Sequence, residues 1–267
     1  MEARKLSVCQ NTLRNREFAT DVDQIARAGI QGIGVSGASL ELVGVAEAKR
    51  SISDAGLEVS SYFSIRGTLT ADGRQPDLDE ARMRLGEASQ IGSPNLLVTL
   101  AKEAGLAYEE ADKRAVDWLA CIAAIAQQYE VQLMLEPVHP IMHQLSFIHR
   151  LGHALEITSQ VESVGVVVDV GHLWWDKDFL ADFRANVGAV ATVQIDNVPI
   201  AALQEFRYER CRLGEGDIPL ASILRSMDAA GYKGYYEIEI VMRLARDERV
   251  PLLHDSREWF EGVWNGG

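Results

Sequence analysis

Short apolar runs of strand length alternate with longer helix-like segments along this chain of 267 residues, and this alternation constrains the fold more than any other feature. Runs such as Val166, Val167 and Val168 are apolar on both faces, as strands buried in a parallel sheet are. The sequence predicts strands at residues 6–9, 32–35, 58–63, 95–100, 131–136, 165–170, 191–196 and 235–240.

The segments between these runs have helical spacing of their apolar residues. Helices are predicted at residues 21–28, 45–55, 78–91, 109–129 and 218–230. Several end at a glycine, which accepts the left-handed conformation at a helix C-terminus: Gly29, Gly56, Gly92 and Gly231. Repeated units of about 33 residues predict an α/β fold, a single (β/α)8 TIM barrel that fills residues 1–267 as one domain. The alternative is an open doubly wound sheet, but residues 10–12 lack its glycine-rich phosphate motif.

Charge and cysteine content exclude some classes of partner. A net charge of −13 argues against a protein that grips nucleic acid phosphates. No window approaches the ~20 apolar residues of a membrane span, and the first eight residues do not resemble a signal peptide. Cys9, Cys121 and Cys211 are odd in number and widely spaced, which favours reduced thiols. We therefore expect a cytoplasmic protein without nucleic acid or membrane partners.

Four successive strands carry polar residues at or near their carboxyl ends, where barrel enzymes place their chemistry. A carboxylate inside an apolar strand is costly unless something compensates its charge. A shared cation would do so, and carboxylate and amide oxygens suit Mg2+ or Mn2+. The alternative is a water-filled mouth in which arginines pair with the carboxylates. The residues concerned are Glu136, Asp169, Gln194, Asp196, Glu237 and Glu239.

The motifs around these residues resemble those of the xylose-isomerase-like sugar isomerase/epimerase superfamily. Glu136 precedes Pro137, Asp169 precedes His172 by three positions, and residues 231–235 read Gly-Tyr-Lys-Gly-Tyr before the last Glu. Ketose 3-epimerases, hydroxypyruvate isomerases, inosose dehydratases and apurinic endonucleases belong to this superfamily. The resemblance covers most of the chain and is strongest from residue 133 to residue 240.

The resemblance implies a role for several residues. Glu239 is preferred to Glu237 as a ligand because it lies five positions after Gly234. One divalent ion, Mn2+ or Mg2+ with Co2+ or Zn2+ as alternatives, would bind to Glu136, Asp169, Gln194 and Glu239. Glu136 and Glu239 would also be the catalytic acid–base pair, and His172 and Arg210 would bind substrate.

Two positions depart from the pattern of many relatives. Gln194 stands where many members have His, although hydroxypyruvate isomerases also have Gln. Met142 stands where ketose 3-epimerases have a further Glu, which makes ketohexose epimerisation a less favoured activity.

Expectations also follow for residues outside the proposed ligand set. His139 and Trp174 are expected to contact substrate. Asp196 is expected either to hold Arg210 or a ligand, or to cap its strand. Glu237 is interpreted as a salt-bridged barrel residue and Cys211 as unreactive. Arg66, in the loop after the third strand, is expected to be a solvated charge, with contact to substrate as the alternative. The acidic loop at residues 214–217 predicts a substrate without phosphate.

The strand-end residues and the resemblance to this superfamily together imply a divalent-metal-dependent isomerase or epimerase of a small unphosphorylated sugar or keto-polyol, acting through an enediolate. One alternative is a metal-dependent lyase, a dehydratase or eliminase, on a keto-sugar, keto-inositol or 3-keto-glycoside. Another is a binding subunit of low activity in a hetero-oligomer. A nuclease is disfavoured because a single ligand set is visible. The expected partner is a small carbohydrate, and a homo-oligomer, most simply a dimer, is expected by analogy.

Overall fold

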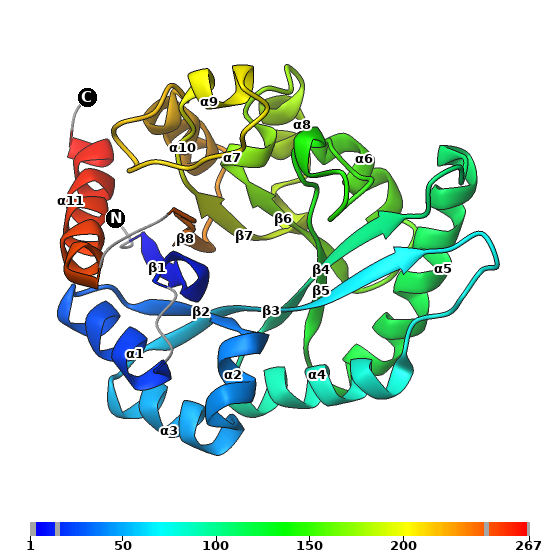
Figure 1. Cartoon of the computed structure of the whole chain (residues 1–267), viewed down its shortest axis with the longest axis horizontal. Helices are drawn as coiled ribbons and strands as arrows, with labels where there is room; N and C mark the ends of the chain where they lie inside the picture. The colour runs from blue at the N-terminus through cyan, green and yellow to red at the C-terminus, as the bar shows by residue number, and fades with distance from the viewer. Residues whose placement is uncertain (1–3, 14–16, 243–245, 266–267) are drawn as a thin grey trace.

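Eight parallel strands close into a barrel in chain order, with β8 paired to β1. The computed structural model describes residues 4–13, 17–242 and 246–265. Figure 1 shows helices arranged around the outside of the sheet. The predicted single (β/α)8 barrel is therefore confirmed. The strands are β1 (Lys5–Cys9), β2 (Gly32–Ser36), β3 (Glu58–Leu69), β4 (Asn95–Lys102), β5 (Gln132–Leu135), β6 (Val164–Asp169), β7 (Val190–Ile195) and β8 (Tyr235–Ile238).

Helices follow the strands, and most of them cover the outer face of the barrel (Figure 1). They are α1 (Phe18–Arg27), α2 (Gly37–Val43), α3 (Val45–Asp54), α4 (Leu78–Ile91), α5 (Tyr108–Ala126), α6 (Leu151–Thr158), α7 (Val170–Leu173), α8 (Phe179–Ala185), α9 (Ile200–Gln204), α10 (Leu220–Ala229) and α11 (Arg249–Asn265). Within the described ranges, no helix combines the length and the apolar character needed to cross a membrane.

Capping residues and glycines mark several helix ends, and they can be recognised in the sequence. Asp77 caps α4, because its side chain accepts hydrogen bonds from the backbone N–H groups of Asp79 and Glu80. The predicted terminal glycines have positive φ angles, 81° at Gly92 and 94° at Gly231. The predicted positions of these helix ends are confirmed.

Strand β3 extends beyond the predicted end at residue 63 and continues to Leu69. Its register against β4 shifts between Phe63 and Ile65, and the pairing then resumes as far as Leu69. A bulge of this kind re-aims side chains without ending the strand. The placement of Arg66 in a loop is therefore wrong: it lies within β3, paired in register with Thr99 of β4.

An apolar layer closes the barrel interior beneath its mouth. Leu97, Met134 and Val167 form this layer, and Phe63 and Ala191 pack against it. Side chains two positions further along a strand point to the same side. The next inward residues on β4, after β5 and on β6 are therefore Thr99, Glu136 and Asp169, which stand above an apolar floor.

Candidate active site

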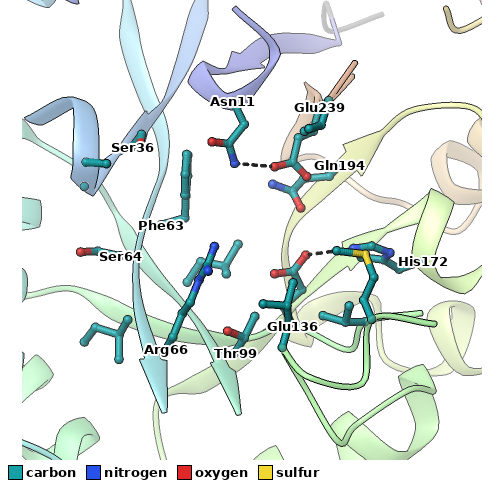
Figure 2. Close-up of a pocket in the computed structure, with 18 of the residues that line it drawn as sticks. Asn11, Ser36, Phe63, Ser64, Arg66, Thr99, Glu136, His172, Gln194 and Glu239 are labelled. Carbon is teal, nitrogen blue, oxygen red and sulfur yellow. Dashed lines mark hydrogen bonds and ion pairs between the residues drawn. The ribbon is translucent and has the colours of Figure 1, made fainter. Parts of the chain in front are cut away.

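A cavity of about 590 Å3 opens at the carboxyl ends of the strands (Figure 2). Five of the predicted site residues line it: Glu136, His172, Gln194, Arg210 and Glu239. Asp169 is fully buried and reaches the same place through its contacts with Arg210 and His172. His139 and Trp174 are not among the lining residues, and Trp174 packs against the hydrophobic core.

Arg210 is a buried cation that holds three carboxylates together. Its Nη2 lies 2.5 Å from Asp169 Oδ2, its Nε lies 2.5 Å from Asp196 Oδ2, and its Nη1 lies 2.9 Å from Glu239 Oε2. These contacts bring together the ends of β6, β7 and β8. Asp196 thus holds Arg210, which is one of the roles predicted for it.

Glu136 is a buried carboxyl with little direct compensation. Its nearest cationic candidate is His172, whose Nε2 lies 4.0 Å from Glu136 Oε1. Burial raises the pKa of Glu136 well above its usual range, and the negative charges of Glu239 and Asp169 raise it further, while Arg210 and Arg66 oppose them. A carboxyl with a raised pKa is a better proton acceptor than an ordinary glutamate, which suits a catalytic acid or base.

His172 is held in place by the residue that precedes its helix. Asp169 Oδ1 accepts a hydrogen bond from the backbone N–H of His172 at 3.1 Å, which caps α7. Burial lowers the pKa of His172 well below its usual value, and Arg210 lowers it further. The imidazole is therefore neutral, and it can accept a hydrogen bond or bind a cation. Ligand atoms of Glu136, Asp169 and His172 lie within 4.8 Å of one another.

The amide of Gln194 is oriented by a carboxylate on the neighbouring strand. Its Nε2 donates to Glu237 Oε1 at 3.0 Å, and its buried Oε1 has no hydrogen-bond partner among the described residues. The other carboxylate oxygen of Glu237 accepts hydrogen bonds from Ser60 Oγ at 2.6 Å and Ser61 Oγ at 2.7 Å. Because a carboxylate can only accept, it directs the amide nitrogen toward itself and leaves the amide oxygen free.

The interpretation of Glu237 as a salt-bridged residue is wrong. In the described part of the chain its partners are two hydroxyls and an amide, and no cation pairs with it. Burial raises the pKa of Glu237, and these hydrogen bonds oppose the rise. The carboxylate reaches β3 from β8 past Gly34, where an added Cβ would lie 2.4 Å from Glu237 Oε2.

Glu239 is held by residues at the end of β1 and just after it. Sequence reasoning did not identify these residues as part of the site. Asn11 Nδ2 donates to Glu239 Oε1 at 3.1 Å (Figure 2). Cys9 Sγ, at the end of β1, lies 3.3 Å from the same oxygen. Burial and the charge of Glu239 raise the pKa of the Cys9 thiol well above its usual value, so Cys9 stays a protonated donor. Thr12 fastens this segment to β8 by accepting from Ile240 N and donating to Ile238 O. The sequence signal that could have identified these residues is their position, since residues 9–12 stand at the carboxyl end of the first predicted strand.

An aromatic ring that was not predicted separates His139 from the cavity. Tyr208 packs against His172 with ring centroids 5.1 Å apart and against His139 with centroids 5.3 Å apart. The Arg210 guanidinium carbon lies 5.7 Å from the centroid of the same ring. Tyr208 therefore forms the wall that keeps His172 and Arg210 in place. Nearby, burial and Asp196 raise the pKa of Cys211 to about 11, in line with the unreactive thiol expected there.

The residues at the barrel mouth fit a divalent cation. The carboxyl groups of Glu136, Asp169, Asp196, Glu237 and Glu239 are buried there, and among the described residues Arg210 is their one buried cationic neighbour. The free amide oxygen of Gln194 adds a hard donor without charge. Excess buried negative charge and an unused oxygen are the conditions under which a hard metal ion binds.

Comparisons with solved structures agree with this architecture. A protein from Sinorhizobium meliloti 1021 is 26% identical, with a TM-score of 0.81 over 95% of this chain and 97% of the other. IolI, solved with a bound zinc atom, is 17% identical, with a TM-score of 0.78 and 97% of each chain covered. An L-ribulose 3-epimerase is 16% identical, with a TM-score of 0.77 over 98% of this chain and 94% of the other.

A comparison with curated proteins gives no match. The sequence profile described as "Xylose isomerase-like TIM barrel" matches residues 22–262, which is most of the chain and contains every residue of the cluster around Arg210. The protein belongs to the family of xylose isomerase-like TIM barrels.

Proposed function

We propose that this protein is a divalent-metal-dependent isomerase or epimerase of a small unphosphorylated sugar or keto-polyol. The observation that carries the proposal is the placement of two buried carboxyl groups, Glu136 and Glu239, on the lining of one cavity. The uncompensated charge and the free Gln194 oxygen described above support a cation between them. The structural similarity to an L-ribulose 3-epimerase is consistent with this chemistry but by itself shows only the fold.

The proposed ligands are Glu136, Asp169, Gln194 and Glu239. His172 is an alternative ligand, since its imidazole belongs to the compact group with Glu136 and Asp169. When bound, Mn2+ or Mg2+, or alternatively Co2+ or Zn2+, supplies a Lewis acid that polarises the substrate carbonyl.

The two glutamates would exchange a proton with the substrate. One carboxylate removes the proton from the carbon next to the carbonyl, and the C–H electron pair moves toward the carbonyl to give an enediolate. The other carboxyl group returns a proton. Return to the same carbon from the opposite face gives an epimer, and return to the neighbouring carbon gives an isomer. His172 and Arg210 would bind substrate hydroxyls on the side lined by Tyr208.

Hydrogen exchange tests this proposal directly. The purified protein, treated with a chelator and then supplied with Mn2+ or Mg2+, is incubated in D2O with unphosphorylated ketoses and keto-inositols. NMR should show deuterium entering at the carbon next to the carbonyl, and only when metal is present. A product of unchanged mass identifies an isomerase or epimerase, whereas an unsaturated product identifies the alternative lyase. Absence of both metal binding and exchange would refute the proposal and favour a binding subunit.

A second prediction concerns the carboxylate that orients Gln194. Glu237→Met removes the acceptor and leaves the amide free to turn its nitrogen toward the cavity. Affinity for Mn2+, measured by calorimetric titration of chelator-treated protein, should fall about 10- to 100-fold. Glu237→Gln keeps one accepting oxygen and should lose less.

Glu58→Met is the matched control, because Glu58 lies at the first position of β3, at the end of the strand away from the cavity. Equal Mn2+ affinity in Glu237→Met and Glu58→Met would show that Gln194 does not depend on Glu237.

A further inference from the structure

Arg66 extends into the cavity, and its side chain has no hydrogen-bond or ion-pair partner within residues 4–13, 17–242 and 246–265. Figure 2 shows its side chain entering the space between Phe63 and Glu136. The other lining arginines are paired: Arg84 with Glu41 and Glu87, and Arg210 with three carboxylates. Across the described ranges, no carboxylate lies within ion-pair distance of Arg66. The guanidinium therefore keeps its fork of donors available to a ligand.

Thr99 offers an unused hydroxyl on the strand next to Arg66. The two residues are register partners on neighbouring strands, Arg66 on β3 and Thr99 on β4, and both line the cavity. Thr99 is 7% exposed, and its buried Oγ1 has no hydrogen-bond partner in the described part of the chain. A buried hydroxyl without a partner is costly, so an oxygen of a bound molecule would relieve that cost.

We propose that Arg66 and Thr99 form a carboxylate-binding subsite, and that the substrate is a keto sugar acid. This inference rests on the proposed function and names its substrate class. The planar guanidinium matches two carboxylate oxygens, and the Thr99 hydroxyl donates to one of them.

Charge and shape favour a carboxylate over the other ligands of an arginine. A neutral sugar would offer the exposed Arg66 side chain no opposite charge within ion-pair distance. A phosphate dianion needs further donors, and the lining offers one unpaired arginine while Glu136 and Glu239 repel extra negative charge. The apolar side chains of Phe63 and Leu97 also line this region, and low local polarity strengthens a charge-assisted pair.

Matched substrate pairs test the subsite. Hydroxypyruvate and dihydroxyacetone differ only in a carboxylate replacing a hydroxymethyl group, as do 2-keto-D-gluconate and D-fructose. In D2O exchange with Mn2+, the acid of at least one pair should have the higher kcat/KM. Arg66→Met should lower kcat/KM for that acid about 10- to 100-fold, the loss expected for a charge-assisted pair. Its neutral partner should lose clearly less, because it loses only the effect of Arg66 on the charge of Glu136.

Two further variants and a control sharpen the result. Arg66→Lys keeps the charge but not the fork and should retain part of the preference. Thr99→Val should reduce the preference for the acid, with a smaller effect on kcat/KM for the neutral substrate. Arg82→Met, on α4 and paired with Asp79 at the surface, should behave as wild type. Equal losses on acid and neutral substrates in Arg66→Met would overturn the subsite.

A binding measurement separates this inference from the proposed reaction. Calorimetry with chelator-treated protein compares D-gluconate with D-glucitol, which differ only in the carboxylate and do not react. D-gluconate should bind more tightly, and Arg66→Met should remove the difference. If this holds while no substrate exchanges deuterium, the subsite stands and the proposed function fails. If neutral ketoses exchange while gluconate binds no better than glucitol, the function stands and the subsite is refuted.

Discussion

Glu136→Gln is expected to reduce metal-dependent deuterium exchange about 100- to 10,000-fold, which is the usual contribution of a general acid or base. Gln has the same shape but cannot accept the substrate proton. The loss should fall on kcat more than on KM, because the substituted group acts on the proton and not on the carboxylate or hydroxyl groups of the substrate. NMR-detected exchange at saturating substrate measures the change.

The same substitution should stabilise the chelator-treated protein near neutral pH. Burial and acidic neighbours raise the pKa of Glu136 in the folded protein. As the pH rises above the usual pKa of a glutamate, the unfolded chain releases a proton that the folded chain retains, so the stability of the folded protein falls. Gln stays neutral and escapes this penalty, so the thermal midpoint should rise at pH 8 and change little at pH 4. Glu109→Gln, at an exposed position in the first turn of α5, is the control. A lower midpoint for Glu136→Gln at pH 8 would contradict the assignment.

Arg210→Met is expected to lower the free energy of unfolding by about 3–5 kcal/mol, the cost of removing one partner from a buried ion pair. Met fills a similar volume but leaves Asp169, Asp196 and Glu239 together without their shared cation. Urea unfolding of chelator-treated protein measures the change. Added Mn2+ should restore part of the lost stability, because a cation bound to the native state compensates the same charges.

The neighbouring arginine gives a matched control for this result. Arg212 pairs with Asp255 at 2.6 Å, but both side chains reach solvent, so Arg212→Met should cost at most about 1 kcal/mol. A similar cost for the two variants would mean that Arg210 does not organise the buried carboxylates.

The barrel could be predicted from the sequence because each strand and its helix follow local rules. The apolar run before Asp169 and the left-handed glycine at Gly92 depend only on neighbouring residues. The end of β3 could not be predicted in this way. Its continuation through Arg66 depends on a shifted pairing with β4, a contact between residues far apart in sequence.

The candidate site also contains residues that the sequence could predict and residues that it could not. Glu136 and Asp169 could be proposed because each follows or ends an apolar run, whereas the choice of Gln194 and Glu239 as ligands depended on the family resemblance. The hydrogen bond from Asn11 to Glu239 and the packing of Tyr208 on His172 could not, since both join segments that only closure of the barrel brings together. Glu237 was misjudged for the same reason: its serine donors lie on β3, which is not its neighbouring strand.

The path of Glu237 across the barrel has a consequence for how the chain can be divided. Strands β1 and β2 separate β8 from β3, and the contact exists because Gly34 leaves the space through which the carboxylate reaches Ser60 and Ser61. A fragment containing β5 to β8 would carry this carboxylate without its hydroxyl donors. A fragment containing β1 to β4 would carry the donors without their acceptor. Each half-barrel alone would therefore leave buried polar groups of this contact without their partners, which favours folding of the barrel as one unit.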